Sequence, residues 1–347
     1  MLEKGNVYYD NLEAFSKNLQ EGLKEIFPDV FHKKERVLKE SILKASNQYI
    51  FEENTSLWSQ TWFKDAYIAY FINTQTSRLF YTFNRIKDTL DFNNISNTID
   101  FGCGPASAHL AASAVFKSGL NKSKWLNIDS SKEALKIAKE VENYFKLNSS
   151  YTLSDKIPEP KSENDLLILS FALCEGLNTE NIFKYKYVLL LEPGQFSNSK
   201  NLIALRQKAL DTGFNALAPC VHQGLCPMRE GAKNWCHDTA PKPKSMPQYN
   251  LPFSGDRLNF SYLLLAKGQA SLANSADARI IGDLRPEKGK SKIALCIDES
   301  PVFLSWLKKS KLDLNLNRGD LIEMPEQAET KGQEVRIETE ISLKNNI

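Results

Sequence analysis

Apolar residues recur every three or four positions through the first part of the chain. The spacing is clearest at Leu12, Phe15, Leu19 and Leu23. It places these side chains on one face of an α-helix, with the polar residues between them on the other face. We therefore predict that residues 1–92 form a helical region.

From about residue 93, short apolar runs alternate with helical patterns. The apolar runs have the length of buried β-strands and occupy 97–101, 125–128, 165–170 and 187–191. The helical patterns cover 105–118, 131–146 and 202–210. This alternation is typical of a mostly parallel, doubly wound sheet. We predict an α/β fold whose Rossmann-like core spans residues 93–213.

The last 134 residues break this rhythm in two different ways. Residues 214–276 begin with an irregular stretch rich in Pro, Cys, Gly and Lys and return to a strand pattern at 260–266. An aperiodic stretch of this length needs a function or an internal staple. Residues 277–347 predict a β-rich, small-barrel-like extension. Its expected strands are 278–283, 292–298, 301–307, 320–323 and 334–343.

Composition narrows the class of protein. The 347 residues include 44 Lys and Arg against 42 Asp and Glu, which excludes a histone-like polycation. No run approaches the roughly 18 to 20 apolar residues of a membrane span, and the first residues lack the apolar core of a secretory signal. We expect a monomer with no membrane partner. It would be cytoplasmic in a bacterium, or mitochondrial if the chain is a processed organellar form.

A glycine-rich motif follows the first predicted strand. The sequence TIDFGCGPA occupies Thr98–Ala106, and Asp129 ends the second predicted strand. The glycines permit a tight turn and close backbone approach to a ligand, while the following helix start offers free N–H groups. The dinucleotide fingerprint G-x-G-x-x-G is absent because Ser107 holds its third glycine position.

This pattern resembles the class I, Rossmann-like methyltransferases that use S-adenosylmethionine. The resemblance implies that Asp100 and the backbone of residues 102–104 hold the methionine end of the cofactor. Asp129 would bind its ribose. The expected cofactor-binding residues are Asp100, Gly102, Cys103, Gly104, Pro105, Asp129, Ser130 and Ser170. We interpret Cys103 as a packing residue rather than a nucleophile.

Catalytic residues are not evident. The strand region DLLILSFALCEG, residues 165–176, lacks the N-P-P-Y type of signature used for exocyclic amines. Its polar groups are Ser170, Cys174 and Glu175, and Glu192 ends the next strand. Glu175 is either a general base or a carboxylate at a helix start. The catalytic residues of any methyl transfer therefore remain unassigned.

A second motif gathers cysteines. Cys220, Cys226 and Cys236 lie within seventeen residues, and Cys296 follows in a predicted strand. In a reducing compartment such a group favours a metal over disulfides. Four thiolates suit a tetrahedral zinc or an iron–sulfur cluster. Two nearby histidines, His222 and His237, are either ligands or groups that surround the ligands.

Several motifs together resemble one family. In chain order they are D-F-G-C-G-P, L-E-P-G, P-C-x-H-x3-C-P, W-C-H and F-S-Y-L-L-L-A, within about residues 60–320. They are similar to the small ribosomal subunit methyltransferase-like family, which includes mitochondrial methyltransferase-like protein 17 and bacterial relatives. The resemblance implies a methyltransferase-like fold and a 4Fe–4S cluster. Its ligands would be Cys220, Cys226, Cys236 and Cys296, in a cysteine-rich insertion.

The same resemblance implies association with ribosomal RNA (rRNA) and proteins of the small ribosomal subunit during its assembly. Cations that could face RNA phosphates are Lys242, Lys244, Arg257, Arg285, Lys288, Lys290 and Lys292. Three hypotheses follow: an assembly factor that binds adenosylmethionine without obvious catalysis, an active rRNA methyltransferase, and a cluster-dependent redox or radical enzyme. The absence of an identifiable catalytic signature favours the first hypothesis over the second. The chain also lacks the C-x3-C-x2-C motif of radical adenosylmethionine enzymes, so we discount the third.

Overall fold

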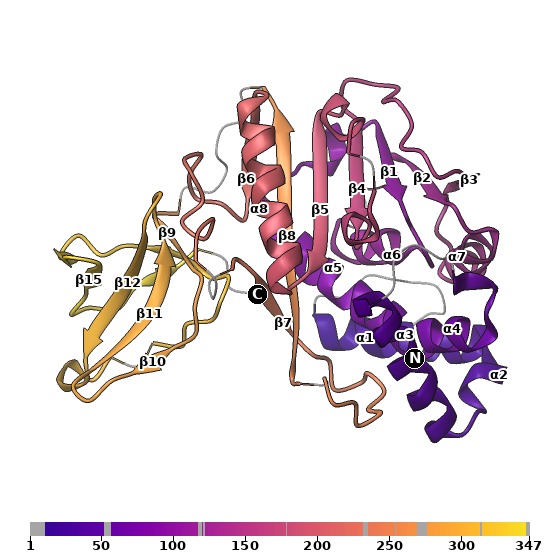
Figure 1. Cartoon of the computed structure of the whole chain (residues 1–347), viewed down its shortest axis with the longest axis horizontal. Coiled ribbons are helices and arrows are strands. Elements are labelled where there is room, and N and C mark those ends of the chain that lie inside the picture. Colours follow the sequence, from indigo (N-terminus) through magenta and orange to yellow (C-terminus); the bar gives the residue numbers. More distant parts are fainter. Residues whose placement is uncertain are drawn as a thin grey trace. The chain divides into compact units, whose positions relative to one another are not determined.

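The computed structural model describes residues 11–51, 57–116, 120, 122–177, 179–231, 235–253, 255–268, 276–312 and 314–344 (Figure 1). The chain divides into two compact units. Unit 1 comprises Met1–Leu191 and Ala240–Leu258, and unit 2 comprises Glu192–Thr239 and Asn259–Ile347. No helix in the described ranges combines the length and apolar character needed to cross a membrane.

The first part of unit 1 is mainly helical in the residues that the structure describes, as predicted. Its helices are α1 (Leu12–Ile26), α2 (Pro28–Phe31), α3 (Glu35–Phe51), α4 (Thr61–Ala66) and α5 (Ile72–Ile86). A π-helical segment, Tyr67–Phe71, joins α4 to α5. The side chain of Asn11 accepts a hydrogen bond from the Ala14 amide at 2.7 Å, which caps α1. On the predicted apolar face of α1, Phe15, Leu19 and Leu23 are buried and Leu12 is half-buried. Phe15 stacks on Phe80 of α5 at 5.0 Å.

Five parallel strands form the sheet of unit 1. They are β1 (Asn97–Phe101), β2 (Lys124–Asp129), β3 (Ser150–Leu153), β4 (Leu166–Ser170) and β5 (Tyr187–Pro193). Their order is β3-β2-β1-β4-β5. Helices α6 (Ser107–Phe116) and α7 (Lys132–Tyr144) follow β1 and β2. This order, reversing beside β1, confirms the predicted Rossmann-like core. Ligands of such sheets bind outside the carboxyl ends of the strands, where the glycine motif lies.

Unit 2 begins with α8 (Phe196–Asp211) and β6 (Phe214–Ala218). Strand β8 (Arg257–Lys267) pairs with β6 in antiparallel register, with Phe214 opposite Lys267. Between them runs the irregular cysteine-bearing segment, which contains the short strand β7 (Asp238–Pro241). The sequence pattern that predicted a strand at 260–266 is thus confirmed.

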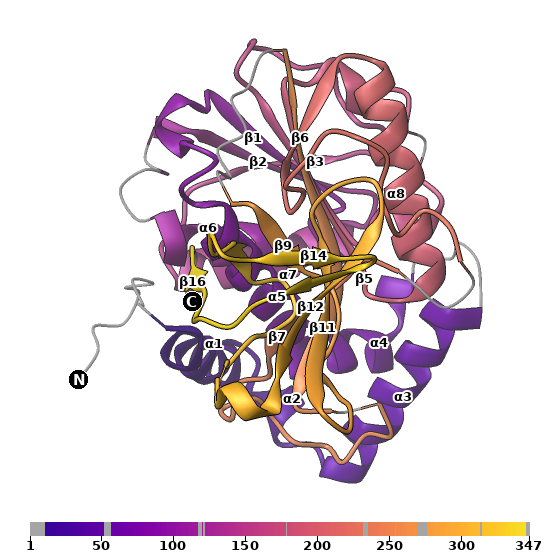
Figure 2. The same cartoon turned by 90° about the vertical axis from the view of Figure 1, so that its left-hand side faces the viewer.

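The end of unit 2 is rich in strands, as predicted (Figure 2). Its strands are β9 (Ala278–Ile280), β10 (Arg285–Pro286), β11 (Lys290–Cys296), β12 (Pro301–Leu307), β13 (Leu321–Glu323), β14 (Glu329–Lys331), β15 (Glu334–Arg336) and β16 (Ser342–Leu343). The order is β14-β15-β12-β11-β9-β13-β16, with β10 paired to β11. In the described residues this path has two ends, so closure into a barrel is not confirmed.

One predicted strand of this sheet is wrong. The expected strand 334–343 is two short strands, β15 and β16. Strand β15 pairs with β12, whereas β16 pairs with β13 toward the opposite end of the sheet. The chain must therefore leave the sheet between them. The core beneath the strands is apolar, and its buried members include Ile280, Ile293, Leu295, Leu304, Trp306 and Ile322.

Candidate functional site

The glycine turn of unit 1 follows β1 directly. Gly102 and Gly104 have φ angles of +70° and +49°, a left-handed conformation that side-chain-bearing residues rarely adopt. The amides of Gly102 and Cys103 donate to the Ile128 carbonyl at 2.8 and 3.0 Å. The turn is thus tied to the end of β2. Cys103 is buried, and burial raises the pKa of its thiol well above the ordinary value, which suits a packing role.

Asp100 carries a buried carboxylate beside the glycine turn. Its side chain is only 1% exposed, and neither carboxylate oxygen has a hydrogen-bond partner in the described structure. Burial, together with Glu142 and Asp129, raises its pKa well above the ordinary value. Buried polar atoms are nearly always satisfied, so an orphan carboxylate beside a glycine turn indicates a place for a ligand donor.

Asp129 holds the turn from the other side. Its Oδ2 accepts the Gly104 amide at 2.9 Å and its Oδ1 accepts the Ser131 amide at 2.8 Å. Burial raises its pKa. From the sequence we expect Asp129 to bind a ribose, and in the structure its carboxylate also holds the glycine turn in place. Each carboxylate oxygen can accept more than one hydrogen bond, so both roles are compatible. Ser130 beside it is exposed.

The backbone is strained at the residue that follows β4. Phe171, directly after the half-buried Ser170, has a φ of +62°, which is unusual for a bulky residue. Glu175 lies in the short 3-10 turn Leu173–Glu175. Its side chain is solvent-accessible, yet desolvation by the surrounding protein and the charge of Asp129 raise its pKa to about 7. Cys174 is exposed and donates to the Phe171 carbonyl at 3.1 Å.

Sequence reasoning missed Arg78 in this region. The Arg78 guanidinium lies 5.5 Å from the centre of the Phe171 ring and has no carboxylate partner among the described residues. Its Nε is buried and has no hydrogen bond to any described residue, and burial lowers the pKa of Arg78 to about 10. Helical periodicity marks Arg78 only as a polar position in α5. Nothing local in the sequence shows that it reaches the end of β4.

In unit 2, all four predicted cysteine ligands line one cavity. Cys220, Cys226, Cys236 and Cys296 share it with His222. The four thiols are free, and burial raises the pKa of Cys226 to about 12. We call this the cysteine cavity. Among the described residues, no three or more His, Cys, Asp or Glu side chains form a group that could hold a metal ion, so the sequence-predicted ligand set stays a prediction.

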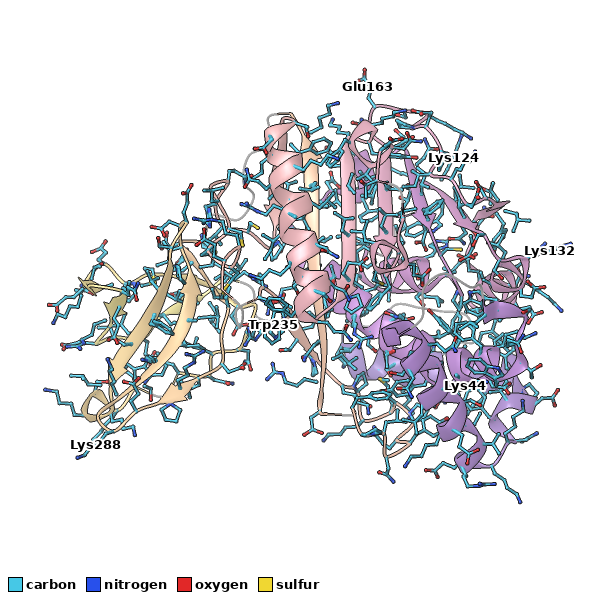
Figure 3. All side chains as sticks on the ribbon, viewed as in Figure 1. Lys44, Lys124, Lys132, Glu163, Trp235 and Lys288 are labelled. Carbon is cyan, nitrogen blue, oxygen red and sulfur yellow. The ribbon has the colours of Figure 1, made fainter. Side chains whose placement is uncertain are left out.

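The two histidines near the cysteines differ. His222 lines the cavity: its Nε2 lies 3.5 Å from Cys296 Sγ, and its buried Nδ1 has no hydrogen-bond partner among the described residues. His237 instead stacks on Trp235 at 5.1 Å, and burial with nearby Arg318 lowers its pKa to about 4. Trp235, labelled in Figure 3, donates through Nε1 to the Gly194 carbonyl at 2.9 Å. His222 is therefore the histidine that faces the cavity.

Two arginines that line the cysteine cavity were also not identified from the sequence. Arg206 donates through Nε to Cys220 Sγ, and Arg279 donates through NH1 to Cys236 Sγ, both at 3.1 Å. Both side chains are almost fully buried. Arginine N–H groups that point at sulfur are suited to thiolates rather than to neutral thiols.

One protein-family model matches a stretch of the chain that contains both the glycine turn and the cysteine cavity. The family model described as mitochondrial small ribosomal subunit Rsm22 matches residues 63–314, which include the glycine turn and all four cysteines. The chain belongs to the Rsm22 family. The resemblance drawn from the sequence motifs is thus confirmed. A search of curated proteins gives no match.

The solved structures similar to this Rsm22-family chain include several methyltransferases. One is a Pyrococcus horikoshii protein assigned as an RNA methyltransferase (13% identity, 67% of this chain, 99% of that chain, TM-score 0.35). Another is a Listeria monocytogenes protein assigned as a class I S-adenosylmethionine-dependent methyltransferase (10%, 79%, 83%, TM-score 0.36). A third is an rRNA methylase from Streptococcus thermophilus (13%, 55%, 95%, TM-score 0.32). These TM-scores are low, and the fold assignment rests on the strand order instead.

The predicted RNA-binding cations of this Rsm22-family chain are divided between the units. Lys242, Lys244 and Arg257 lie in unit 1, and the other four lie in unit 2. Lys290 pairs with Glu334 at 2.5 Å, and Lys292 pairs with Glu287 at 2.5 Å. Lys288 is exposed in the turn between β10 and β11 (Figure 3). Because glutamates already neutralise Lys290 and Lys292, these two lysines are weaker candidates for contacts with RNA phosphates than Lys288 is.

Proposed function

We propose that this chain is an assembly factor of the small ribosomal subunit that binds rRNA and S-adenosylmethionine and carries a four-cysteine iron–sulfur cluster. The observation that carries the proposal is the cysteine cavity. It brings together thiols from distant parts of the sequence and sets arginine N–H groups against two of their sulfurs. Membership of a family described by the mitochondrial small ribosomal subunit supports the ribosomal role.

The four thiols that line the cysteine cavity are the type of donor that a sulfur-ligated group requires. Cys220, Cys226, Cys236 and Cys296 would hold the cluster, and it would supply a folding staple and a one-electron centre. His222 adds a further polar group at the cavity, because its buried Nδ1 has no hydrogen-bond partner within the described part of the chain. Four thiols also suit zinc, which is the alternative metal. The resemblance given by the motifs favours the iron–sulfur cluster.

The glycine turn fits the methionine end of S-adenosylmethionine, which supplies an electrophilic methyl group when bound. The orphan carboxylate of Asp100 is suited to the ammonium group, directly or through water. Arg78, a cation without a carboxylate partner among the described residues, is suited to the carboxylate group. Asp129 retains acceptor capacity for the ribose hydroxyls. The remaining predicted contacts are backbone groups at Gly102 to Pro105, with Ser130 and Ser170 nearby.

A second candidate function, methyl transfer to small-subunit rRNA, has one observation in its favour. Glu175 lies after β4, at the carboxyl edge of the sheet, and its pKa is raised to about 7. A base is most effective when its pKa lies near the working pH. Glu175 is therefore the residue that would accept a proton from an rRNA nucleophile.

Anaerobic purification with metal and sulfide analysis tests the first proposal. We expect brown protein with equal iron and sulfide and an absorbance at about 400 nm, as sulfur-to-iron charge transfer produces. Cys220→Ser should lose the colour, and Cys174→Ser, a matched change at an exposed cysteine of unit 1, should keep it. Colourless protein that holds one zinc per chain contradicts the cluster.

The ribosomal role needs a separate test. In cells that lack the protein, we expect small subunits to accumulate as precursors, and wild-type protein to crosslink to their rRNA. Asp100→Asn should rescue assembly if cofactor binding serves no catalysis. If Asp100→Asn fails while a specific methyl mark on the rRNA is also lost, methyl transfer is the function.

A further inference from the structure

Arg206 and Arg279 are held differently around the cysteine cavity. Arg279 NH2 forms an ion pair with Asp238, and both side chains are almost completely buried. Arg206 donates through NH1 to the Gly224 carbonyl and through NH2 to the His222 carbonyl, both at 2.8 Å. Within the described residues Arg206 has no carboxylate partner. Its third contact is the 3.1 Å hydrogen bond from Nε to Cys220 Sγ.

The positive charges of the two arginines are therefore compensated to different degrees. The positive charge of Arg279 is neutralised by Asp238, whereas no described carboxylate neutralises that of Arg206. A buried cation without an anion is unfavourable, because burial removes the water that would solvate it. Carbonyl groups supply dipoles but no negative charge. Among the described contacts of Arg206, only the thiol of Cys220 can become an anion, and a thiolate is the form of cysteine that binds metals.

We propose that Arg206 is the charge-setting residue of the cysteine cavity: it stabilises the metal-bound thiolate of Cys220 and raises the reduction potential of the cluster. This inference rests on the cluster proposed above. Reduction adds one negative charge to a group already bound by four thiolates, and a nearby cation favours the more negative state. The N–H···S hydrogen bond acts in the same direction, because hydrogen bonds to sulfur and net charge both set cluster potentials.

Geometry also allows a matched control. Lys200, on the same helix α8, donates through Nζ to the carbonyls of Met228 and Arg229 at 2.6 and 3.1 Å. Like Arg206, it joins α8 to the cysteine-bearing segment with a cation, but none of its described contacts is to sulfur. If Arg206 acted only by holding this segment against α8, removal of Lys200 should have the same effect as removal of Arg206.

The test is a redox titration of anaerobically purified full-length chains. Wild type, Arg206→Gln, Arg206→Lys and Lys200→Gln are compared by the optical and electron paramagnetic resonance signals of the cluster. We expect a lower midpoint potential in Arg206→Gln, an intermediate one in Arg206→Lys, which keeps the charge, and an unchanged one in Lys200→Gln. A potential in Arg206→Gln equal to that of wild type overturns the inference and leaves the cluster standing.

Two other outcomes are informative. If Arg206→Gln loses its cluster, the iron content per chain becomes the readout: Arg206→Lys should retain more iron than Arg206→Gln, and equal retention overturns a role for the charge. If wild-type protein is colourless and holds zinc, the cluster proposal fails, and the inference about its potential fails with it. Metal analysis of wild type thus separates the two failures.

Discussion

The amide of Gly104 donates to Oδ2 of Asp129 at 2.9 Å, so the glycine turn after β1 is fixed by a carboxylate at the end of β2. The other oxygen of Asp129 accepts the Ser131 amide at the start of α7. One side chain thereby holds the two backbone segments that would surround a bound nucleoside. The shape of the turn and the position of Asp129 depend on each other.

Asp129→Asn should therefore loosen the turn and weaken cofactor binding together. Its amide nitrogen cannot accept, so one of the two backbone N–H groups loses its partner, at a cost of about 1–3 kcal/mol in stability. Chemical denaturation and calorimetric titration with S-adenosylmethionine measure both effects. The control is Ser130→Ala, an exposed neighbour. Unchanged stability in Asp129→Asn would mean that the clamp contributes nothing.

Asp100→Asn should have opposite effects on stability and on binding. Because the pKa of Asp100 is raised, the folded chain binds a proton on this carboxylate more tightly than the unfolded chain does. Its contribution to stability is therefore fully present at low pH. Between the ordinary pKa and the raised pKa it is lost, by about 1.4 kcal/mol for each pH unit. Asparagine removes this loss, so the ligand-free variant should be more stable than wild type at pH 8.

The same substitution should weaken binding of S-adenosylmethionine. A hydrogen bond from a charged donor contributes about 1.5–3 kcal/mol, and asparagine offers no charge to the ammonium group. Denaturation at pH 5 and pH 8 and titration with the cofactor provide the data. A variant that is less stable at pH 8 and binds the cofactor normally contradicts the assignment of Asp100.

Glu142 should show the reverse pH dependence. It is fully buried and accepts hydrogen bonds from His109 Nδ1 and Ser149 Oγ at 2.5 Å, from Asn127 Nδ2 at 2.9 Å and from the Tyr151 hydroxyl. Burial alone would raise its pKa, but these donors outweigh burial and lower it below the ordinary value of 4.5. Its contribution is thus present above pH 4.5 and is lost as pH falls through the lowered pKa.

Glu142→Gln should accordingly destabilise unit 1 at pH 7, by about 3–5 kcal/mol if the loss resembles that of a buried charged partner. The difference from wild type should shrink below pH 4. Urea denaturation at pH 7 and pH 3.5 measures it, and Glu140→Gln, an exposed change on the same helix, should have little effect. An equal difference at both pH values would show that the carboxylate is not responsible.

The local parts of this structure could be predicted from the sequence, and the long-range parts could not. Strands β1 and β4 and the glycine turn depend on runs of a few residues, so pattern alone locates them. The role of Arg78 depends on its contact with Phe171, which is far along the chain. The role of Arg206 depends on the irregular path of the cysteine-bearing segment that it contacts. Helical periodicity marks both only as polar positions. The ion pair of Lys290 with Glu334, which lies 44 residues away, depends in the same way on the order of strands in the sheet. The ion pair of Lys292 with Glu287 depends on how the chain turns between β10 and β11.

Those ion pairs make a prediction about RNA. Lys288→Ala should lower affinity for small-subunit rRNA and reduce the slope of log affinity against log salt by about 1, because one phosphate contact is lost. Lys290→Ala should change the slope less, since Lys290 already faces Glu287 and Glu334. Filter binding from 50 to about 300 mM salt compares the two. Equal slopes for wild type and Lys288→Ala would exclude this turn from the RNA interface.

Methyl transfer, if the chain performs it, should depend on pH through Glu175. A base must be unprotonated, so the rate should rise through pH 7 and level off above it, following the raised pKa of Glu175. Glu175→Gln should lower the rate by about 100-fold or more and remove this dependence. Because the charge of Asp129 contributes to the raised pKa, Asp129→Asn should shift the remaining profile toward lower pH. Transfer of labelled methyl groups to small-subunit rRNA between pH 5.5 and 9 provides the profile, with the exposed Glu163→Gln as control. A wild-type chain that binds the cofactor but transfers no label at any pH excludes the enzyme and leaves the assembly factor.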